Sequence, residues 1–212
     1  MAKPGRRSAI KGGKSSTAKR DHLVDAAFRA LREEGFAGAS ARAIAACGEF
    51  NSALIFYYFD SVNDLLVEAL SRSSRAQLEK YEDALASVTT LPDLVASVKS
   101  RIHDDMESGH VKVVAELIGA SSSDDQLRAA VFEQVKPWME FTERTVERIL
   151  ASSGLGGLVP AARVSFVIVA LFLGMELLAD VAGDDEMVDG LFDSAHRLAG
   201  LLGAPLRDGA AR

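Results

Sequence analysis

Apolar residues recur at helical spacing in one segment after another of this 212-residue chain. The first such stripe runs through Leu23, Ala26, Ala27, Ala30 and Leu31, which are neighbours on one face of an α-helix. Beyond residue 75 no segment alternates apolar and polar residues as a half-buried strand does. The spacing therefore predicts an all-α protein with about nine helices and no sheet.

Capping residues and glycines mark where these helices begin and end. We expect the first helix over 17–34, because Gly35 stands where glycine commonly ends a helix. Ser61 and Asp64 form a capping box that opens the fourth helix. Pro137 predicts a kink in the long helix that contains it. The other helices are expected between Ser40 and Gly48, from Phe50 or Asn51 through the aromatic run that follows, and over 90–109, 110–120, 124–152, 160–182 and 185–202.

Positive charge is concentrated at the N-terminus. Residues 1–20 contain seven basic residues and no acidic one, whereas the rest of the chain contains 17 basic and 30 acidic residues. Residues 1–16 are rich in Gly, Ser and Lys, and we expect them to be disordered. A short basic arm on an acidic body favours a polyanionic partner, nucleic acid first; the alternative is a solubilising tail without a partner. An export signal is not expected, because no apolar segment follows Arg6 and Arg7.

Cysteine and histidine are too sparse for a disulfide framework or a structural zinc site. The chain has one cysteine, Cys47, and four histidines. We therefore expect a reducing cytoplasm, no metal and no cofactor. His103 and His110 lie seven residues apart, but Gly109 interrupts the helix that would place them on one face. The longest uncharged apolar run, Val164 to Met175, is too short to span a bilayer, so no membrane association is expected.

Two short helices joined by a tight turn, after an amphipathic first helix, form the helix-turn-helix pattern that places its second helix in the DNA major groove. Three further motifs stand in register with it: a corner at Gly35-Phe36, the pair Ile44-Ala45, and the run Phe56-Tyr57-Tyr58-Phe59. With these motifs the stretch from Arg20 to Leu70 resembles the DNA-binding head of the tetracycline-repressor (TetR) family. The resemblance implies a divergent helical domain for ligand binding and dimerisation in the rest of the chain.

The resemblance also implies where DNA is contacted. In the family, the residue matching Ser40 caps the second helix beside a phosphate, and the residue matching Arg42 reaches base edges. Physical chemistry supports both roles, since free N–H groups at a helix start bind phosphate and a guanidinium pairs bidentately with guanine. Adjacent helical residues differ by about 100°, so at least one of Tyr57 and Tyr58 faces the DNA. The seven candidate DNA-binding residues are Ser40, Arg42, Asn51, Ser52, Ala53, Tyr57 and Tyr58.

The chain departs from the family pattern at three positions. Glu49 replaces the glycine of the turn, Phe56 lacks the hydroxyl of a common tyrosine, and Val62 replaces a lysine. We favour a left-handed backbone at Glu49, with Gly48 as the alternative holder of that conformation. Phe56 is expected in the core of the head, together with Leu54, Ile55 and Phe59.

The C-terminal half contains the helix Pro160 to Ala182, which is apolar on nearly every side and needs a cover such as a partner subunit. The kink at Pro137 leaves space near Trp138, where we expect a pocket for a small molecule; the alternative is ordinary core. No motif of a hydrolase, metalloenzyme or P-loop enzyme appears, so an enzyme is not expected. The candidate pocket residues are Met106, Phe132, Trp138, Met139, Phe141, Phe166 and Phe172.

These observations predict a disordered arm over 1–16, a three-helix DNA-binding domain over 17–70 and a larger helical ligand-binding and dimerisation domain over 71–212. The expected function is a cytoplasmic homodimeric regulator, a repressor that a small-molecule effector releases from a pseudo-palindromic site in double-stranded DNA. The main alternative is a helical ligand-binding or enzymatic protein with an incidental N-terminal motif. A third hypothesis is an architectural DNA binder that uses mainly the arm.

Overall fold

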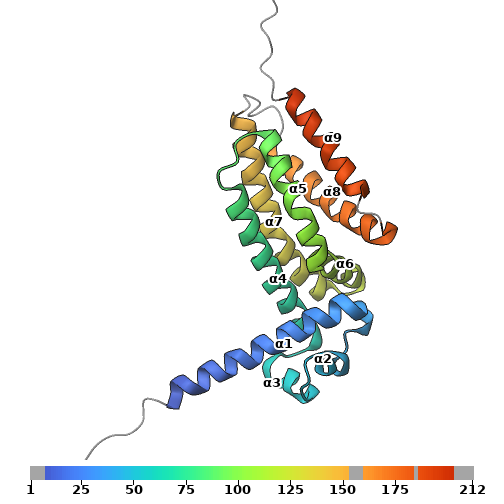
Figure 1. Cartoon of the computed structure of the whole chain (residues 1–212). Helices are drawn as coiled ribbons and strands as arrows, with labels where there is room; N and C mark the ends of the chain where they lie inside the picture. Colours follow the sequence, from blue (N-terminus) through green and yellow to red (C-terminus); the bar gives the residue numbers. More distant parts are fainter. Residues whose placement is uncertain (1–7, 153–159, 184–185, 203–212) are drawn as a thin grey trace, which may run out of the picture. The chain divides into compact units, whose positions relative to one another are not determined.

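The computed structural model describes residues 8–152, 160–183 and 186–202, and in these ranges every regular element is helical (Figure 1). The predicted all-α class is confirmed. The elements are α1 (Ser8–Gly38), α2 (Ala41–Cys47), η1 (Ser52–Leu54), α3 (Ile55–Tyr58), α4 (Val62–Leu85), α5 (Leu91–Ser108), α6 (His110–Ala120), η2 (Ser121–Ser123), α7 (Asp125–Ser152), α8 (Ala161–Ala182) and α9 (Glu186–Leu202).

The chain divides into two compact units. The first consists of Met1–Ser73 with Lys112–Val131, and the second of Ser74–Val111 with Phe132–Arg212. The predicted division at residue 70 keeps all later residues together, whereas here the segment that contains most of α6 lies in the unit of the N-terminal helices. The assignment of DNA binding and ligand binding to separate domains stays a prediction.

The first unit is built around α1, whose predicted apolar stripe is completely buried. This helix begins at Ser8, so residues 8–16 are helical and the predicted disorder there is wrong. Extending an existing helix needs no new nucleus, which is the costly step. Residues 1–7 of the predicted arm lie outside the described residues.

A break at Gly35 ends the regular part of α1. Gly35 has φ 68° and ψ 179°, a conformation that favours glycine. The backbone N–H of Phe36 donates a hydrogen bond to Glu116 Oε2 of α6 at 2.8 Å. A Cβ at Gly35 would lie 2.9 Å from the same oxygen. The corner expected from the Gly35-Phe36 motif is therefore held by a carboxylate from a distant part of the sequence.

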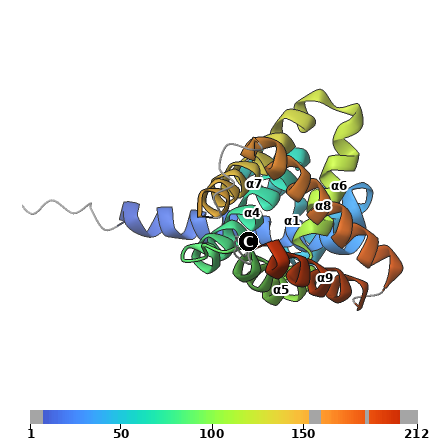
Figure 2. The same ribbon diagram turned by 90° about the horizontal axis from the view of Figure 1, so that it is seen from above.

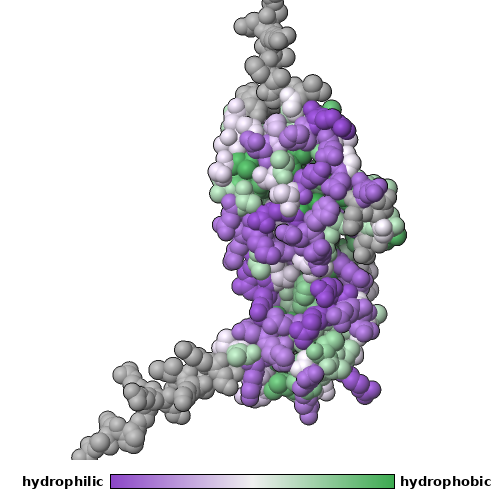
Figure 3. Space-filling model, viewed as in Figure 1, coloured by the Kyte–Doolittle hydropathy of each residue, from purple (hydrophilic) through white to green (hydrophobic). Residues whose placement is uncertain are grey.

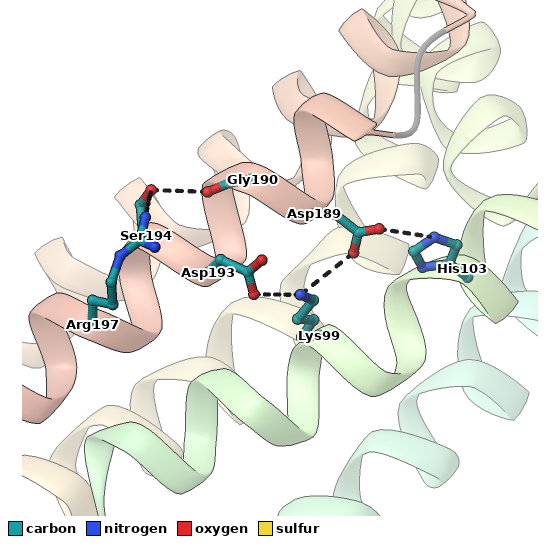
Figure 4. A network of polar contacts seen from close by, with 7 residues as sticks. All are labelled: Lys99, His103, Asp189, Gly190, Asp193, Ser194 and Arg197. Atoms are coloured by element: carbon teal, nitrogen blue, oxygen red, sulfur yellow. Dashed lines mark hydrogen bonds and ion pairs between the residues drawn. The ribbon is translucent and has the colours of Figure 1, made fainter.

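The second unit packs α5, α7, α8, α9 and the C-terminal part of α4 around two apolar clusters. Thr90 caps α5, and Gly109 ends it with φ 71°, both as predicted. Helices α5 and α9 lie side by side in both ribbon views (Figures 1 and 2). Lys99 Nζ lies 2.5 Å from Asp193 Oδ1 and 3.7 Å from Asp189 Oδ1, so one ammonium group links two carboxylates of α9 to α5 (Figure 4).

Helices α8 and α9 expose large apolar side chains. Those of α8 include Val167, Leu171 and Leu178, exposed by 61%, 61% and 68%. The face seen in Figure 3 is by contrast mostly hydrophilic, with small scattered apolar patches. The stretch Ala161–Ala179 is long and apolar enough to cross a membrane by length and composition alone, and only 11% of it is buried. Length and composition therefore do not exclude a span, because the apolar stretch continues past Arg163 and Glu176, which bound the uncharged run.

Candidate nucleic-acid interface

The second helix of the motif is capped at Ser40 as predicted, and of the two predicted starts for the segment after the turn, Phe50 and Asn51, the structure has Asn51 as the cap. Ser40 Oγ accepts from the backbone N–H of Ala43 at 3.2 Å at the start of α2. Asn51 Oδ1 accepts from the N–H of Ala53 at 2.9 Å at the start of η1. The recognition segment is a 3₁₀ turn followed by four α-helical residues, rather than one regular α-helix.

The turn between these helices has its left-handed residue at Glu49, with φ 55°. Gly48 has φ −102°, which any residue adopts. The favoured position for the left-handed conformation is thus confirmed. Gly48 is nevertheless crowded, because a Cβ there would lie 2.2 Å from Cε1 of Phe50 and 2.9 Å from Cβ of Ala26.

Two side chains of α1 that the sequence did not indicate are hydrogen-bonded to backbone carbonyl groups of the turn. The imidazole of His22 donates through Nε2 to the carbonyl oxygen of Gly48 at 2.7 Å. The guanidinium of Arg29 donates to the carbonyl oxygen of Cys47 at 3.0 Å. These carbonyls lie at the end of α2, where the helix leaves its acceptors unpaired. Their spacing in sequence, 26 and 18 residues, gives no local signal.

The predicted DNA-binding residues differ in exposure. Ser40, Arg42, Asn51 and Ala53 are exposed, while Ser52 is half-buried. A side chain at Arg42 therefore has room to reach a partner outside the head. Among the described residues, the Arg42 guanidinium forms no intramolecular ion pair such as the one between Arg20 and Glu68 at 3.0 Å.

The aromatic run presents two of its rings to solvent. Tyr57 is 78% exposed and Phe56 is 59% exposed. Tyr58 is half-buried, packs edge-on against Tyr57 at 4.9 Å between ring centroids, and accepts a hydrogen bond from Ser16 Oγ at 3.4 Å. The predicted core position of Phe56 is wrong, because α3 is too short to bury more than one side, which Ile55 occupies. Phe59 is buried as predicted.

The predicted pocket residues of the body fall into different surroundings. Trp138 and Phe141 belong to one apolar cluster, and Met106 and Phe172 pack against the other. Met139 is half-buried, and its carbonyl oxygen accepts from Ser165 Oγ at 2.7 Å. Phe132 and Phe166 are exposed by 54% and 61%. In the described part of the chain, no group of three or more His, Cys, Asp or Glu residues is placed to hold a metal ion.

Titratable groups are buried beside these apolar residues. We call Tyr81, Asp105, His110, Trp138 and Glu176 the buried acid cluster. Tyr81 donates its hydroxyl hydrogen to Asp105 Oδ2. Burial raises the pKa of Asp105, and burial together with Asp105 raises the pKa of Glu176 to about 8. Burial lowers the pKa of His110 to about 4, so this ring is neutral at pH 7.

Comparison with known proteins connects the head and the fold to one class of protein. Residues 23–69 match the sequence model of a family described as bacterial regulatory proteins, tetR family. No curated protein sequence matches the chain. A TetR-family transcriptional regulator from Cytophaga hutchinsonii has a similar structure, with a TM-score of 0.73, 15% identity, and coverage of 88% of this chain and 95% of that one.

Two further solved structures with this fold carry ligands. FadR from Bacillus subtilis, in complex with stearoyl-CoA, has a TM-score of 0.71 and 16% identity, covering 84% of this chain and 96% of that one. The multidrug binding protein EbrR, complexed with imidazole, has a TM-score of 0.59 and 20% identity, covering 90% of this chain and 97% of that one. The chain thus shares the fold of transcriptional regulators over both of its units.

Proposed function

We propose that this chain, whose residues 23–69 match the tetR family of bacterial regulatory proteins, is a homodimeric repressor that a small-molecule effector releases from a pseudo-palindromic operator. The broader function, without the repressor and effector details, is that of a DNA-binding transcriptional regulator rather than an enzyme. The observation that carries the proposal is the capped helix-turn-helix, from which Arg42 and Tyr57 project into solvent. We place the protein in the cytoplasm, where its DNA is accessible.

In this proposal the recognition segment lies in the major groove. The N-terminal residues of such a segment meet base edges and phosphates first. Asn51, Ser52 and Ala53 therefore face bases or phosphates, and Arg42 reads a base edge. Tyr57 and Tyr58 lie against the sugar–phosphate backbone, with Ser40 beside a phosphate.

The proposed partner for the apolar surface of α8 and α9 is a second copy of this chain. Its exposed residues recur at the spacing of helices that pair side by side. On α8 the stripe is Val167, Leu171, Leu178 and Val181, and on α9 it is Met187, Leu191 and Leu198. Pairing both helices with their symmetry mates forms a four-helix interface and sets two heads on one twofold axis.

A bilayer is a less suitable cover for α8 than a second copy. The opposite side of this helix buries Ser165 and Glu176, which are 1% and 5% exposed. Ser165 is hydrogen-bonded to a carbonyl oxygen of α7, so this side is already packed against protein. Lipid would surround a spanning helix on every side, whereas this side of α8 is occupied by protein.

The effector is proposed to bind in the second unit. FadR and EbrR have been solved with stearoyl-CoA and with imidazole respectively, so this fold accommodates ligands of different chemistry. In this proposal the two heads have one arrangement that binds DNA and another that does not. A ligand that binds the second arrangement more tightly shifts the population away from the DNA-bound form. The buried acid cluster and the residues predicted around Trp138 are the candidate contacts.

The test is selection of preferred sequences from random duplex DNA by the full chain. We expect a pseudo-palindrome and binding that weakens with salt. Arg42→Ala is expected to cost about 1 to 3 kcal/mol on the selected site and less on random DNA. Arg128→Ala, at an exposed arginine paired with Asp125 three residues away, is the control and should leave both affinities unchanged.

The alternatives predict different results in the same experiment. A ligand-binding or enzymatic protein with an incidental motif yields no enriched sequence. An architectural binder yields salt-sensitive binding without sequence preference. Equal loss on selected and random DNA for Arg42→Ala would show that Arg42 contacts phosphate only.

A further inference from the structure

Four helices of the second unit bring polar groups together in an apolar setting. Tyr81 comes from α4, Asp105 from α5, Trp138 from α7 and Glu176 from α8. The ring of Tyr81 packs edge-on against Trp138 at 5.5 Å and against Phe172 at 6.5 Å between centroids. The two carboxyl groups are 7% and 5% exposed, so both are buried away from water.

The two carboxyl groups of the cluster are not equivalent. Asp105 accepts the hydroxyl hydrogen of Tyr81. Glu176 Oε1 is buried and has no hydrogen-bond partner among the described residues. An unpaired buried polar atom of this kind costs about 1 to 3 kcal/mol, so it needs a reason. One turn of α4 before Tyr81, Gln77 Oε1 is a second buried acceptor without a partner, although its Nε2 donates to Ser108 Oγ at 2.9 Å.

The missing partner must supply hydrogen-bond donors. Both unpaired atoms near the cluster are acceptors, and His110 is neutral because burial lowers its pKa to about 4. Arg101, whose guanidinium lies 5.9 Å from the centre of the Tyr81 ring, and Lys80 are the basic groups that act on Asp105. Neither basic group donates a hydrogen bond to Glu176 Oε1.

We propose that the buried acid cluster binds the ammonium or amidinium group of a small organic cation, with Glu176 as the paired anion. Carboxylates supply charge and acceptors, and the faces of aromatic rings attract a desolvated cation. Phe172 and Met106, which pack against the neighbouring apolar cluster, lie beside the apolar part of the ligand. This inference rests on the proposed function, in which it gives the chemical class of the effector.

The site predicts that cation binding releases a proton. With a pKa of about 8, Glu176 is mostly protonated at neutral pH, and pairing with a cation requires the carboxylate. Burial and the nearby Asp105 set this ionisation, because both oppose a negative charge on Glu176. Tyr81, whose own pKa is raised by burial, and His110 beside Trp138 face the site as neutral groups. The dissociation constant should fall by up to about tenfold per pH unit below pH 8 and level off above it.

Trp138 provides the measurement, because it is the single tryptophan of the chain. Its indole stacks with His110 at 6.1 Å and donates to Ser74 Oγ at 2.9 Å, so its emission reports this cluster. The probe is benzamidine, which stays cationic from about pH 6 to about pH 9, and its neutral isostere benzamide is the matched ligand control. We expect a saturable change in emission with benzamidine and at least about tenfold weaker binding of benzamide.

Glu176→Gln is the informative variant, since an amide resembles the protonated carboxyl of the free protein and should fold. It is expected to weaken benzamidine binding by about tenfold or more at pH 8 and to abolish the pH dependence. Glu140→Gln removes an exposed carboxylate two residues from Trp138 and should leave both properties unchanged. Equal binding of benzamidine and benzamide, a pH-independent dissociation constant, or full affinity in Glu176→Gln would overturn the proposal.

DNA binding by the ligand-free chain separates this inference from the proposed function. If the chain selects an operator but does not prefer benzamidine over benzamide, the cation site is wrong and the proposed repressor function stands. If the chain binds benzamidine through Glu176 but does not bind DNA, the cation site stands and the proposed repressor function is wrong. Should Glu176→Gln fail to fold, two other measurements decide the question. Asp105→Asn should alter the proton release, because Asp105 helps to raise the pKa of Glu176. The pH profile of the unmodified chain reports the same proton release directly.

Discussion

Glu49 carries the one positive φ found at a residue other than glycine in the described ranges, 55°. This conformation costs a residue with a Cβ roughly 1 to 2 kcal/mol relative to glycine, because Cβ approaches the carbonyl oxygen. Glu49→Gly should raise the free energy of unfolding by several tenths to about 1 kcal/mol, after the greater entropy of glycine in the unfolded chain is subtracted. Urea denaturation measures the change, and DNA affinity should rise because an exposed carboxylate beside the recognition segment is lost.

The neighbouring position supplies the control for that substitution. Gly48→Ala changes the same turn by one methyl group, but its Cβ would lie 2.2 Å from the ring of Phe50. We expect this variant to lose about 1 to 3 kcal/mol through overpacking. A melting temperature that falls in Glu49→Gly, or one that is unchanged in Gly48→Ala, would contradict this account of the turn.

Glu176 gives the stability of the second unit a pH dependence. Its pKa is raised from 4.5 to about 8 on folding, so its stabilising contribution is complete below pH 4.5 and is lost as pH rises through 8. Glu176→Gln cannot ionise and should gain on the unmodified chain as pH rises, by about 4 kcal/mol between pH 5 and pH 9. Denaturation at several pH values checks this, and parallel curves for the two chains would refute it.

His110 acts in the opposite direction, which allows the two groups to be distinguished. Its pKa falls from 6.5 to about 4 on folding, so its contribution is complete above pH 6.5 and is lost as pH falls through 4. Below pH 4.5 Glu176 is protonated in both the folded and the unfolded chain, so the loss of stability that His110 causes there should be unchanged in Glu176→Gln.

Among the helices, α8 carries the proposed dimer contact on one face only. Leu171 is 61% exposed, whereas Phe172 is half-buried and packs against Tyr81. Leu171→Asp should therefore give folded monomers, because an unpaired charge in the interface is costly. Light scattering measures the mass and circular dichroism the helix content. Phe172→Asp should instead unfold the second unit, because it places a charge against Tyr81.

Local signals in the sequence predicted the elements well. The caps Ser40, Asn51 and Thr90 and the terminating Gly109 act within a few residues of their own position, so the chain displays them directly. The exposure of Phe56 was missed because it depends on the shortness of α3, which follows a 3₁₀ turn, and no residue type marks such a turn.

Contacts between distant segments were beyond prediction from one sequence. The bonds of His22 and Arg29 to the turn join residues that are 26 and 18 positions apart, and that of Glu116 to Phe36 spans 80 positions. The buried acid cluster likewise has no motif, because its members come from five helices. Acidic residues are usually solvated, and burial of Asp105 and Glu176 is the exception.

For the molecule as a whole, acidic residues outnumber basic ones beyond residue 20. The basic N-terminus is therefore the main source of positive charge outside the recognition segment. Deleting residues 1–16 removes five positive charges and part of α1. Affinity should fall on every DNA sequence, and the slope of log affinity against log salt should flatten. Titration at several salt concentrations measures both. Replacing the five basic residues by glutamine is the control that keeps the length, and an unchanged slope in that variant would exclude the arm from DNA contact.

The hydrogen bond from Phe36 to Glu116 has a consequence for anyone who transplants the head. Residues 112–131 belong to the same compact unit as the first helices, and Val113 and Leu117 are completely buried. A chimera cut at residue 70 would leave the corner at Gly35 without its acceptor and remove these side chains from the fragment. The DNA-reading module of this protein is therefore discontinuous in its gene, and a functional graft must carry both pieces.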